Sequence, residues 1–118
     1  MDFKKLELEN KIKFIGRTRL DNDKLFMNFS GSGIKIKVLT EKLVIKTFST
    51  KYDHNNSYPY ISILIDEERY DYGLYQEQHE IIITLSKEVH EIQILKRTES
   101  SVSFAAILDI VADEFLEL

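Results

Sequence analysis

The serine residues that could act in catalysis are not arranged in a motif that marks a hydrolase. A nucleophilic serine needs a base within hydrogen-bond reach and donors for the developing oxyanion. Ser32, between Gly31 and Gly33, is the most conspicuous candidate, but the Gly-x-Ser-x-Gly pattern of a nucleophile elbow is absent from the sequence. Because glycine readily adopts positive φ angles, a tight turn explains this motif better. The sequence therefore predicts no catalytic residue in this chain.

The histidines do not form a metal-binding motif. His54, His79 and His90 are not spaced as a local pair of ligands. His90 shares strand parity with Ile92 and Ile94, which favours a role in capping a strand over binding an ion. We expect no metal ion and no other cofactor.

Two polar runs leave one alternative open, which is a structural calcium ion. Calcium prefers carboxylate and amide oxygens as ligands. Such groups stand at Asp53 with Asn55 and Asn56, and at Asp66 with Glu67 and Glu68. A solvated turn is the simpler interpretation of both runs.

Tyrosine is concentrated in the middle third of the chain. An aromatic face with a hydroxyl group suits stacking against a pyranose ring and hydrogen bonding to sugar hydroxyls. Tyrosine is also favoured in strands, so packing within a sheet is the competing interpretation. The candidates for sugar contacts are Tyr58, Tyr60, Tyr72 and Tyr75.

A run of four polar residues, Lys96-Arg97-Thr98-Glu99, follows an apolar strand that contains Ile92 and Ile94. The simplest interpretation is a solvated strand end, since charged residues that leave a strand are usually exposed. The alternative is a cluster at the boundary with a partner. Arg97 and Glu99 share parity, and Arg17 after the first strand could join them.

Composition indicates one globular domain that spans residues 1–118. With 43% apolar and 31% charged residues, the chain can bury roughly two-thirds of its unfolded surface. The formal net charge of -4, with 16 scattered Lys and Arg residues, argues against nucleic acid or an anionic membrane as a partner.

The absence of cysteine excludes disulfides and thiol chemistry but leaves the cellular compartment open. The first ten residues contain no apolar run of signal-peptide length, and no stretch approaches the length of a membrane span. As written, the sequence is expected to be soluble and to carry no export signal.

Alternating hydrophobicity predicts a series of short strands. The clearest example places Ile34, Ile36 and Val38 on one face, with lysines between them on the other. Further strands are expected over residues 11–15, 25–29, 43–49, 60–65, 70–75, 80–85 and 89–96. This regular spacing favours a β-sandwich.

Three finer expectations concern connections. Segments 34–38 and 43–49 are expected to form a hairpin. Segment 60–65, apolar on nearly both faces, is expected at a central position and to reverse at Asp66-Glu67-Glu68. Residues 104–111 fit both helical spacing and strand alternation, so periodicity alone leaves this segment open.

These residues resemble the N-terminal domain of carbohydrate esterase family two, a jelly-roll β-sandwich that precedes an SGNH-type hydrolase domain. The matching stretches are Gly16-Arg17-Thr18, Phe29-Ser30-Gly31-Ser32-Gly33-Ile34, Ile63-Leu64-Ile65-Asp66, the run from His90 to Lys96-Arg97-Thr98-Glu99, and Phe104 with Ile107-Leu108-Asp109. The resemblance implies an all-β jelly roll of about eight to nine short, mostly antiparallel strands. It also favours a strand for the last segment.

The resemblance implies a non-catalytic domain of a carbohydrate O-acetyl esterase. In that family the nucleophile belongs to a Gly-Asp-Ser block in the following hydrolase domain, and this chain contains no such block. The family usually has Trp before the Gly-Ser-Gly turn, where Asn28 and Phe29 stand here, and Gly where Glu67 stands. The expected partner is the hydrolase domain of the same polypeptide, with Arg17, Lys96, Arg97, Thr98 and Glu99 as the interface or structural cluster. An independent carbohydrate-binding module that uses the tyrosines is the alternative.

Overall fold

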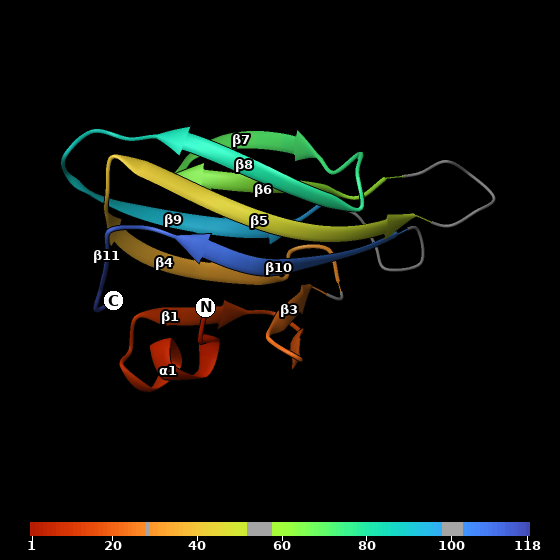
Figure 1. The fold of residues 1–118 in the computed structure, drawn as a ribbon, viewed down its shortest axis with the longest axis horizontal. Coiled ribbons are helices and arrows are strands. Elements are labelled where there is room, and N and C mark those ends of the chain that lie inside the picture. Colours follow the sequence, from red (N-terminus) through yellow and green to blue (C-terminus); the bar gives the residue numbers. More distant parts are fainter. Residues whose placement is uncertain (28, 52–57, 98–102) are drawn as a thin grey trace.

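The computed structural model describes residues 1–27, 29–51, 58–97 and 103–118. Within these residues the chain forms one short helix and eleven strands (Figure 1). The elements are α1 (Phe3–Leu8), β1 (Ile12–Ile15), β2 (Thr18–Asp21), β3 (Lys24–Met27), β4 (Gly33–Leu39), β5 (Lys42–Lys51), β6 (Tyr60–Ile65), β7 (Glu68–Gly73), β8 (Gln78–Thr84), β9 (Val89–Lys96), β10 (Ser103–Val111) and β11 (Glu114–Leu116).

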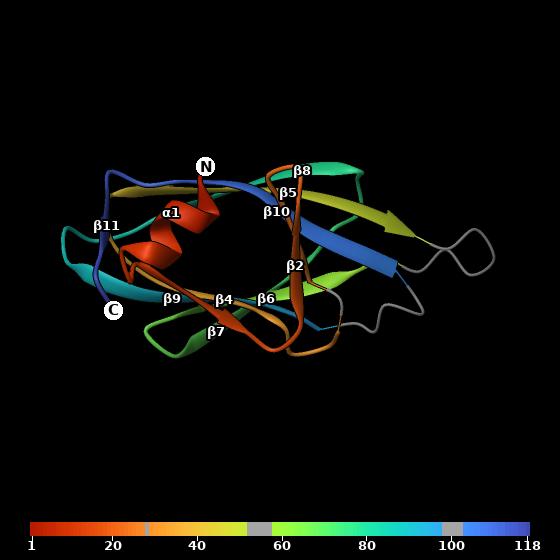
Figure 2. The same ribbon diagram turned by 90° about the horizontal axis from the view of Figure 1, so that it is seen from below.

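Two antiparallel sheets pack face to face, which confirms the expected all-β sandwich. The first sheet has the order β1-β4-β9-β6-β7, and β11 also pairs with β4. The second has the order β2-β3-β10-β5-β8. Figure 2 shows the two layers with α1 across one open side, next to β1. The described residues contain more strands than the eight to nine expected, because short segments such as β2 and β11 also pair.

The core lies between the sheets and follows the alternation seen in the sequence. On β4, Ile34, Ile36 and Val38 are fully buried. The paired strand β9 supplies Ile92 and Ile94 to the same layer. Further buried side chains come from both sheets and are Ile61, Ile63, Leu43, Ile45, Ala105 and Ile107.

The expected hairpin between β4 and β5 is wrong. Strand β4 pairs with β1, β9 and β11, whereas β5 pairs with β8 and β10 in the other sheet. Thr40 and Glu41 therefore connect the two layers rather than two neighbours. Alternation shows which side chains face the core, and it is equally well satisfied when two successive strands face each other across the core.

The reversal after β6 forms as expected. Asp66 and Glu67 adopt positive φ angles of 50° and 75°, and Glu68 begins β7. Two left-handed residues match the twist of the flanking strands, as in tight hairpins. Strand β6 pairs with β7 on one side and β9 on the other, so it is an interior strand of its sheet.

The closing segment is strand β10, as the family resemblance favoured. Its register with β5 shifts between Ile107 and Asp109, which marks a β-bulge. The bulge moves the inward-facing positions, so that Ala105 and Ile107 are followed by Ile110 in the core.

The helix α1 was not foreseen in the sequence. Asp2 caps it, because its carboxylate accepts a hydrogen bond from the backbone N–H of Lys5 at 3.0 Å. Phe3 is buried and Leu6 packs against the core. The cap and the three-residue spacing of these apolar side chains are the sequence signals for this single turn and a half of helix.

Candidate functional site

One end of the first sheet gathers aromatic and cationic side chains from the ends of five strands, β1, β4, β6, β7 and β9, and from the connections beyond them. The register aligns one row across this sheet, made of Ile15, Gly33, Leu95, Ser62 and Asp71. Arg17, Phe29, Tyr60, Tyr75 and Arg97 lie at or beyond that row, where β9 ends and β6 begins (Figure 1). We call these five residues the tyrosine–arginine end.

A fixed carboxylate lies beside the tyrosine–arginine end, on the outer face of β6 and β7. Asp71 accepts two hydrogen bonds from Arg69, Nε to Oδ1 at 2.9 Å and Nη2 to Oδ2 at 3.0 Å. The hydroxyl of Ser62, which is fully buried, donates to Oδ1 at 2.5 Å. The hydrogen bonds from Arg69 and Ser62 lower the pKa of Asp71 to about 2, and the positive charge of Arg97 adds to the effect.

A hollow of about 340 Å³ is lined by Tyr60, Arg69, Asp71 and Arg97. Arg97 is held next to Tyr60, because its backbone N–H donates to the Tyr60 carbonyl oxygen at 2.8 Å. Its side chain is exposed, and within the part of the chain that the structure describes its guanidinium forms no ion pair. The hollow thus contains two guanidinium groups and one carboxylate, which is already bound to Arg69.

Three of the four candidate tyrosines form one cluster. Tyr75 meets Tyr58 and Tyr60 edge to face, with ring centroids 5.5 and 5.9 Å apart. The hydroxyls of Tyr60 and Tyr75 are 2.8 Å apart, and this hydrogen bond raises the pKa of Tyr75, whose hydroxyl stays protonated at neutral pH. Tyr72 lies apart from them, because its ring packs against the core.

A second hollow adjoins this cluster. It has a volume of about 390 Å³ and is lined by Ser49, Thr50, Tyr58, Tyr75, Gln76 and Glu77. Gly73 makes the arrangement possible, since a Cβ atom there would come within 2.3 Å of the Tyr75 ring. The two hollows thus combine exposed aromatic rings with polar groups that can donate and accept hydrogen bonds.

Lys96 is not part of a solvated strand end, and that interpretation is wrong for this residue. Its side chain is fully buried, at 0% exposure. Lys96 is two positions from Ile94 and pairs with Ile61, so it faces the interior of the sandwich. Lys96 shares strand parity with Ile92 and Ile94, which predicts an inward-facing side chain. The solvated interpretation rested instead on its charge, which usually keeps a lysine exposed.

Arg17 and Arg97 contact the same turn, formed by residues 29–32. The Arg17 guanidinium carbon lies 5.3 Å from the centre of the Phe29 ring. The Ser30 hydroxyl donates to the Arg97 carbonyl oxygen at 3.3 Å. Thr98 and Glu99, the other residues expected in this cluster, lie outside the described residues.

Ser32 is a structural residue of that turn. Its hydroxyl donates to the Phe29 carbonyl oxygen at 2.5 Å and accepts from the Phe29 N–H at 3.2 Å. Gly31 has a φ of +85°, and a Cβ on Gly33 would lie 1.7 Å from the Ile94 carbonyl oxygen. The turn interpretation of this motif is therefore confirmed.

At the opposite end of the sandwich, Ser86, His90 and Asp66 stand in the hydrogen-bonding order of a catalytic triad. His90 Nε2 lies 2.9 Å from Ser86 Oγ, and Nδ1 lies 2.5 Å from Asp66 Oδ2. Sequence reasoning missed this arrangement, because it depends on the approach of two turns that are distant in the chain.

The surroundings of this triad support a structural role. Ser86 Oγ is also 3.4 Å from the Glu88 carboxylate, and His90 Nε2 is 3.3 Å from the Ser86 carbonyl oxygen. Asp66 is half exposed on a turn. Catalysis by serine depends on an enclosed, preorganised environment, whereas these contacts tie the turn before β7 to the turn before β9.

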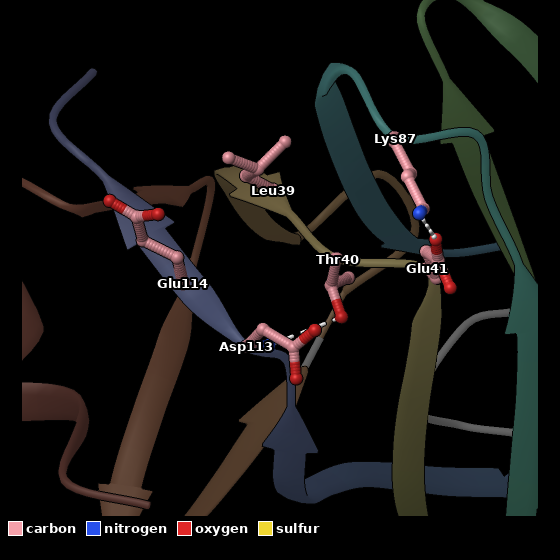
Figure 3. Close-up of a pocket in the computed structure, with 6 residues that line it drawn as sticks. All are labelled: Leu39, Thr40, Glu41, Lys87, Asp113 and Glu114. Carbon is pink, nitrogen blue, oxygen red and sulfur yellow. Dashed lines mark hydrogen bonds and ion pairs between the residues drawn. The ribbon is translucent and has the colours of Figure 1, made fainter.

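A third hollow, of about 360 Å³, also lies at this opposite end (Figure 3). Lys87 is paired with Glu41 across it at 3.1 Å. The Thr40 hydroxyl accepts from the Asp113 N–H at 3.1 Å and so links the connection between the sheets to the start of β11. These contacts engage Lys87, Glu41 and the Thr40 hydroxyl, whereas the carboxylates of Asp113 and Glu114, which also line the hollow, form no ion pair among the described residues.

No group of three or more His, Cys, Asp or Glu residues is placed to hold a metal ion in the described part of the chain. The carboxylate of Asp66, one of the two calcium candidates, is taken up by His90 and by the backbone N–H of Glu91 at 2.9 Å. The other candidate, at Asp53, Asn55 and Asn56, lies outside the described residues. Among those described, no helix is long and apolar enough to cross a membrane.

Comparison with protein families decides how the chain is classified. The family described as carbohydrate esterase 2 N-terminal matches residues 14–118, which is most of the sequence. The chain belongs to this family. No curated protein matched the sequence.

Solved structures similar to this carbohydrate esterase 2 N-terminal domain include whole esterases. An acetyl xylan esterase from Butyrivibrio proteoclasticus matches with a TM-score of 0.81 and 16% identity, over 92% of this chain and 31% of that chain. A family two carbohydrate esterase from Cellvibrio japonicus matches with a TM-score of 0.77 and 19% identity, over 92% and 32%. The domain thus spans about a third of the length of these esterases.

The same domain is similar to a separate class of β-sandwich. A carbohydrate-binding module of family 36, solved with calcium and xylotriose, matches with a TM-score of 0.56 and 11% identity, over 89% of this chain and 98% of that one. At this identity the likeness shows a shared fold.

Proposed function

We propose that the chain is the non-catalytic N-terminal domain of a carbohydrate O-acetyl esterase and that it packs against an SGNH-type hydrolase domain. Family membership over residues 14–118 is the observation that carries this proposal. The match to a third of each esterase supports it, as does the lack of a Gly-Asp-Ser block in this sequence. The hydrolase domain would supply the nucleophile and its base.

The turn of residues 29–32 is the surface best suited to that contact. Phe29 is 45% exposed, although aromatic side chains of this size favour burial. Arg17 stacks on it, and the backbone of Arg97, which follows β9, accepts a hydrogen bond from Ser30 of the turn. Aromatic residues and arginine are the types enriched at the centre of protein interfaces. The two hydrogen bonds between Ser32 and Phe29 hold the turn in place before any partner binds.

The test is a serine substitution at Phe29 in the two-domain polypeptide. Val111→Ser is the matched control, because Val111 is also apolar and 46% exposed but lies on the other sheet. We expect Phe29→Ser to lower the melting temperature and the esterase activity of the two-domain protein while it leaves the 118-residue chain folded. Equal effects of the two substitutions on the two-domain protein would refute this interface.

A second function is sugar binding by the tyrosine cluster. The observation that favours it is the placement of Tyr58, Tyr60 and Tyr75 between two hollows at one end of the sheet. Tyr60 and Tyr75 remain substantially exposed, so their rings are open to a ligand. The domain would then extend the polysaccharide-binding side of the esterase. Titration of the chain with xylo-, manno- and cello-oligosaccharides tests this role, and loss of binding in Tyr60→Ala is the expected result.

A further inference from the structure

We propose that the hollow lined by Tyr60, Arg69, Asp71 and Arg97 binds a pyranose that carries a carboxylate, as in a uronic acid unit of an acidic polysaccharide. This inference rests on the sugar-binding role proposed for the tyrosine cluster and adds the class of sugar. The arrangement of charges in the hollow carries it.

Asp71 is hydrogen-bonded to Arg69 and so does not occupy the Arg97 guanidinium that an incoming anion would bind. Its two oxygens accept from Arg69 at 2.9 and 3.0 Å, and Oδ1 also accepts from the buried Ser62 hydroxyl. This carboxylate is therefore fixed and its charge is balanced by Arg69. With two guanidinium groups and one carboxylate, the hollow keeps one net positive charge, and among the described residues the Arg97 guanidinium forms no ion pair.

Arg97 is suited to a carboxylate by its chemistry and by its position. A guanidinium binds a carboxylate through two parallel hydrogen bonds, which fix the orientation of the bound group. The Arg97 backbone is anchored to the Tyr60 carbonyl oxygen at 2.8 Å, and the two residues line the same hollow. A ligand with a carboxylate attached to a pyranose ring would use both groups at once.

The neighbouring hollow gives the site room for a second sugar unit. Tyr60 lines the first hollow and Tyr75 lines the second, and their hydroxyls are hydrogen-bonded to each other. The second hollow is lined by uncharged polar groups of Ser49, Thr50 and Gln76 as well as by Glu77. We therefore assign the acidic unit to the Arg97 side and a neutral unit to the Tyr58 side.

The probes are a xylo-oligosaccharide that carries a glucuronic acid branch and the same molecule with its carboxyl group reduced to an alcohol. Calorimetric titration of the 118-residue chain should show at least about tenfold tighter binding of the acidic form, and this preference should shrink as salt is added. Arg97→Gln should remove the preference. Arg19→Gln is the matched control, since Arg19 is an exposed arginine on β2 in the other sheet, and it should leave the preference unchanged.

The outcomes separate this inference from the function on which it rests. Equal binding of the two forms, lost in Tyr60→Ala, would overturn the acidic specificity and leave the sugar-binding role intact. No binding of either form would overturn both. An acidic preference that persists in Arg97→Gln would also overturn the assignment, provided that the variant melts at the temperature of the unmodified chain.

Discussion

Asp66 Oδ2 lies 2.5 Å from His90 Nδ1, and Asp66 Oδ1 accepts a hydrogen bond from the backbone N–H of Glu91 at 2.9 Å. One carboxylate thus joins the turn before β7 to the start of β9. Two hydrogen bonds lower the pKa of Asp66. The bond from the Glu91 backbone N–H contributes most, and the bond from His90 contributes next. These contacts explain why a polar turn with two left-handed residues has a defined geometry.

Asp66→Asn should therefore destabilise the domain by roughly 1 kcal/mol, a value that allows for solvent screening of a half-exposed carboxylate. Asp23→Asn is the matched control, because Asp23 is an exposed aspartate that also has a positive φ, of 64°. Asparagine tolerates that conformation well, so the backbone effect is common to both variants. Equal midpoints in urea denaturation would show that the contacts of Asp66 do not stabilise the fold.

The stability of the domain should fall as the pH drops from about 4 to about 2. The pKa of Asp71 is lowered from 3.8 to about 2 in the folded chain, so the folded state binds fewer protons than the unfolded state over this range. A lowered pKa stabilises the fold above the unfolded value, and this stabilisation is lost as Asp71 becomes protonated. Asp66 acts in the same direction. Thermal melting of Asp71→Asn should depend less steeply on pH between these limits, and an unchanged slope would contradict the role of Asp71.

Ile63→Ala should cost about 2 to 5 kcal/mol of unfolding free energy, because it leaves a cavity at a fully buried position of an interior strand. Ile82→Ala removes the same atoms from a side chain that is 56% exposed on the edge strand β8. It should cost less than about 1 kcal/mol. Similar losses for both variants in chemical denaturation would place the core elsewhere.

Gly73→Ala should displace the Tyr75 ring without unfolding the domain. The added Cβ would come within 2.3 Å of the end of that ring, which is a movable side chain rather than backbone. Loss of the Tyr60–Tyr75 contact should change the aromatic NMR signals of both residues and weaken any sugar binding. Unchanged Tyr75 signals in Gly73→Ala would rule out the close packing of this ring.

Sequence reasoning succeeded where one local rule determines the structure. The alternation of Ile34, Ile36 and Val38 identified β4 and its buried face, and the polar run at Asp66 identified a turn. It failed on the partner of β5, because periodicity shows which face of a strand is buried but not which strand lies next to it.

The candidate site was predictable only in part. Tyr58, Tyr60 and Tyr75 were chosen by residue type, and the structure brings them together, but Tyr72 faces the core because it pairs with Ile61. Arg69 and Asp71 were overlooked, since their contact with Ser62 depends on the pairing of β6 with β7. Register of this kind follows from tertiary packing, which a single sequence does not specify.

Hydrogen exchange of the backbone amides of residues 29–32 is the most direct test of the central claim, that the domain packs against a hydrolase domain through this turn. The amides should be measured in the 118-residue chain alone and in the polypeptide that carries the hydrolase domain. Packing predicts markedly slower exchange at Phe29 and its neighbours in the longer polypeptide, with no change at the opposite end around Ser86 and Lys87. Identical exchange at residues 29–32 in the two proteins would contradict the claim.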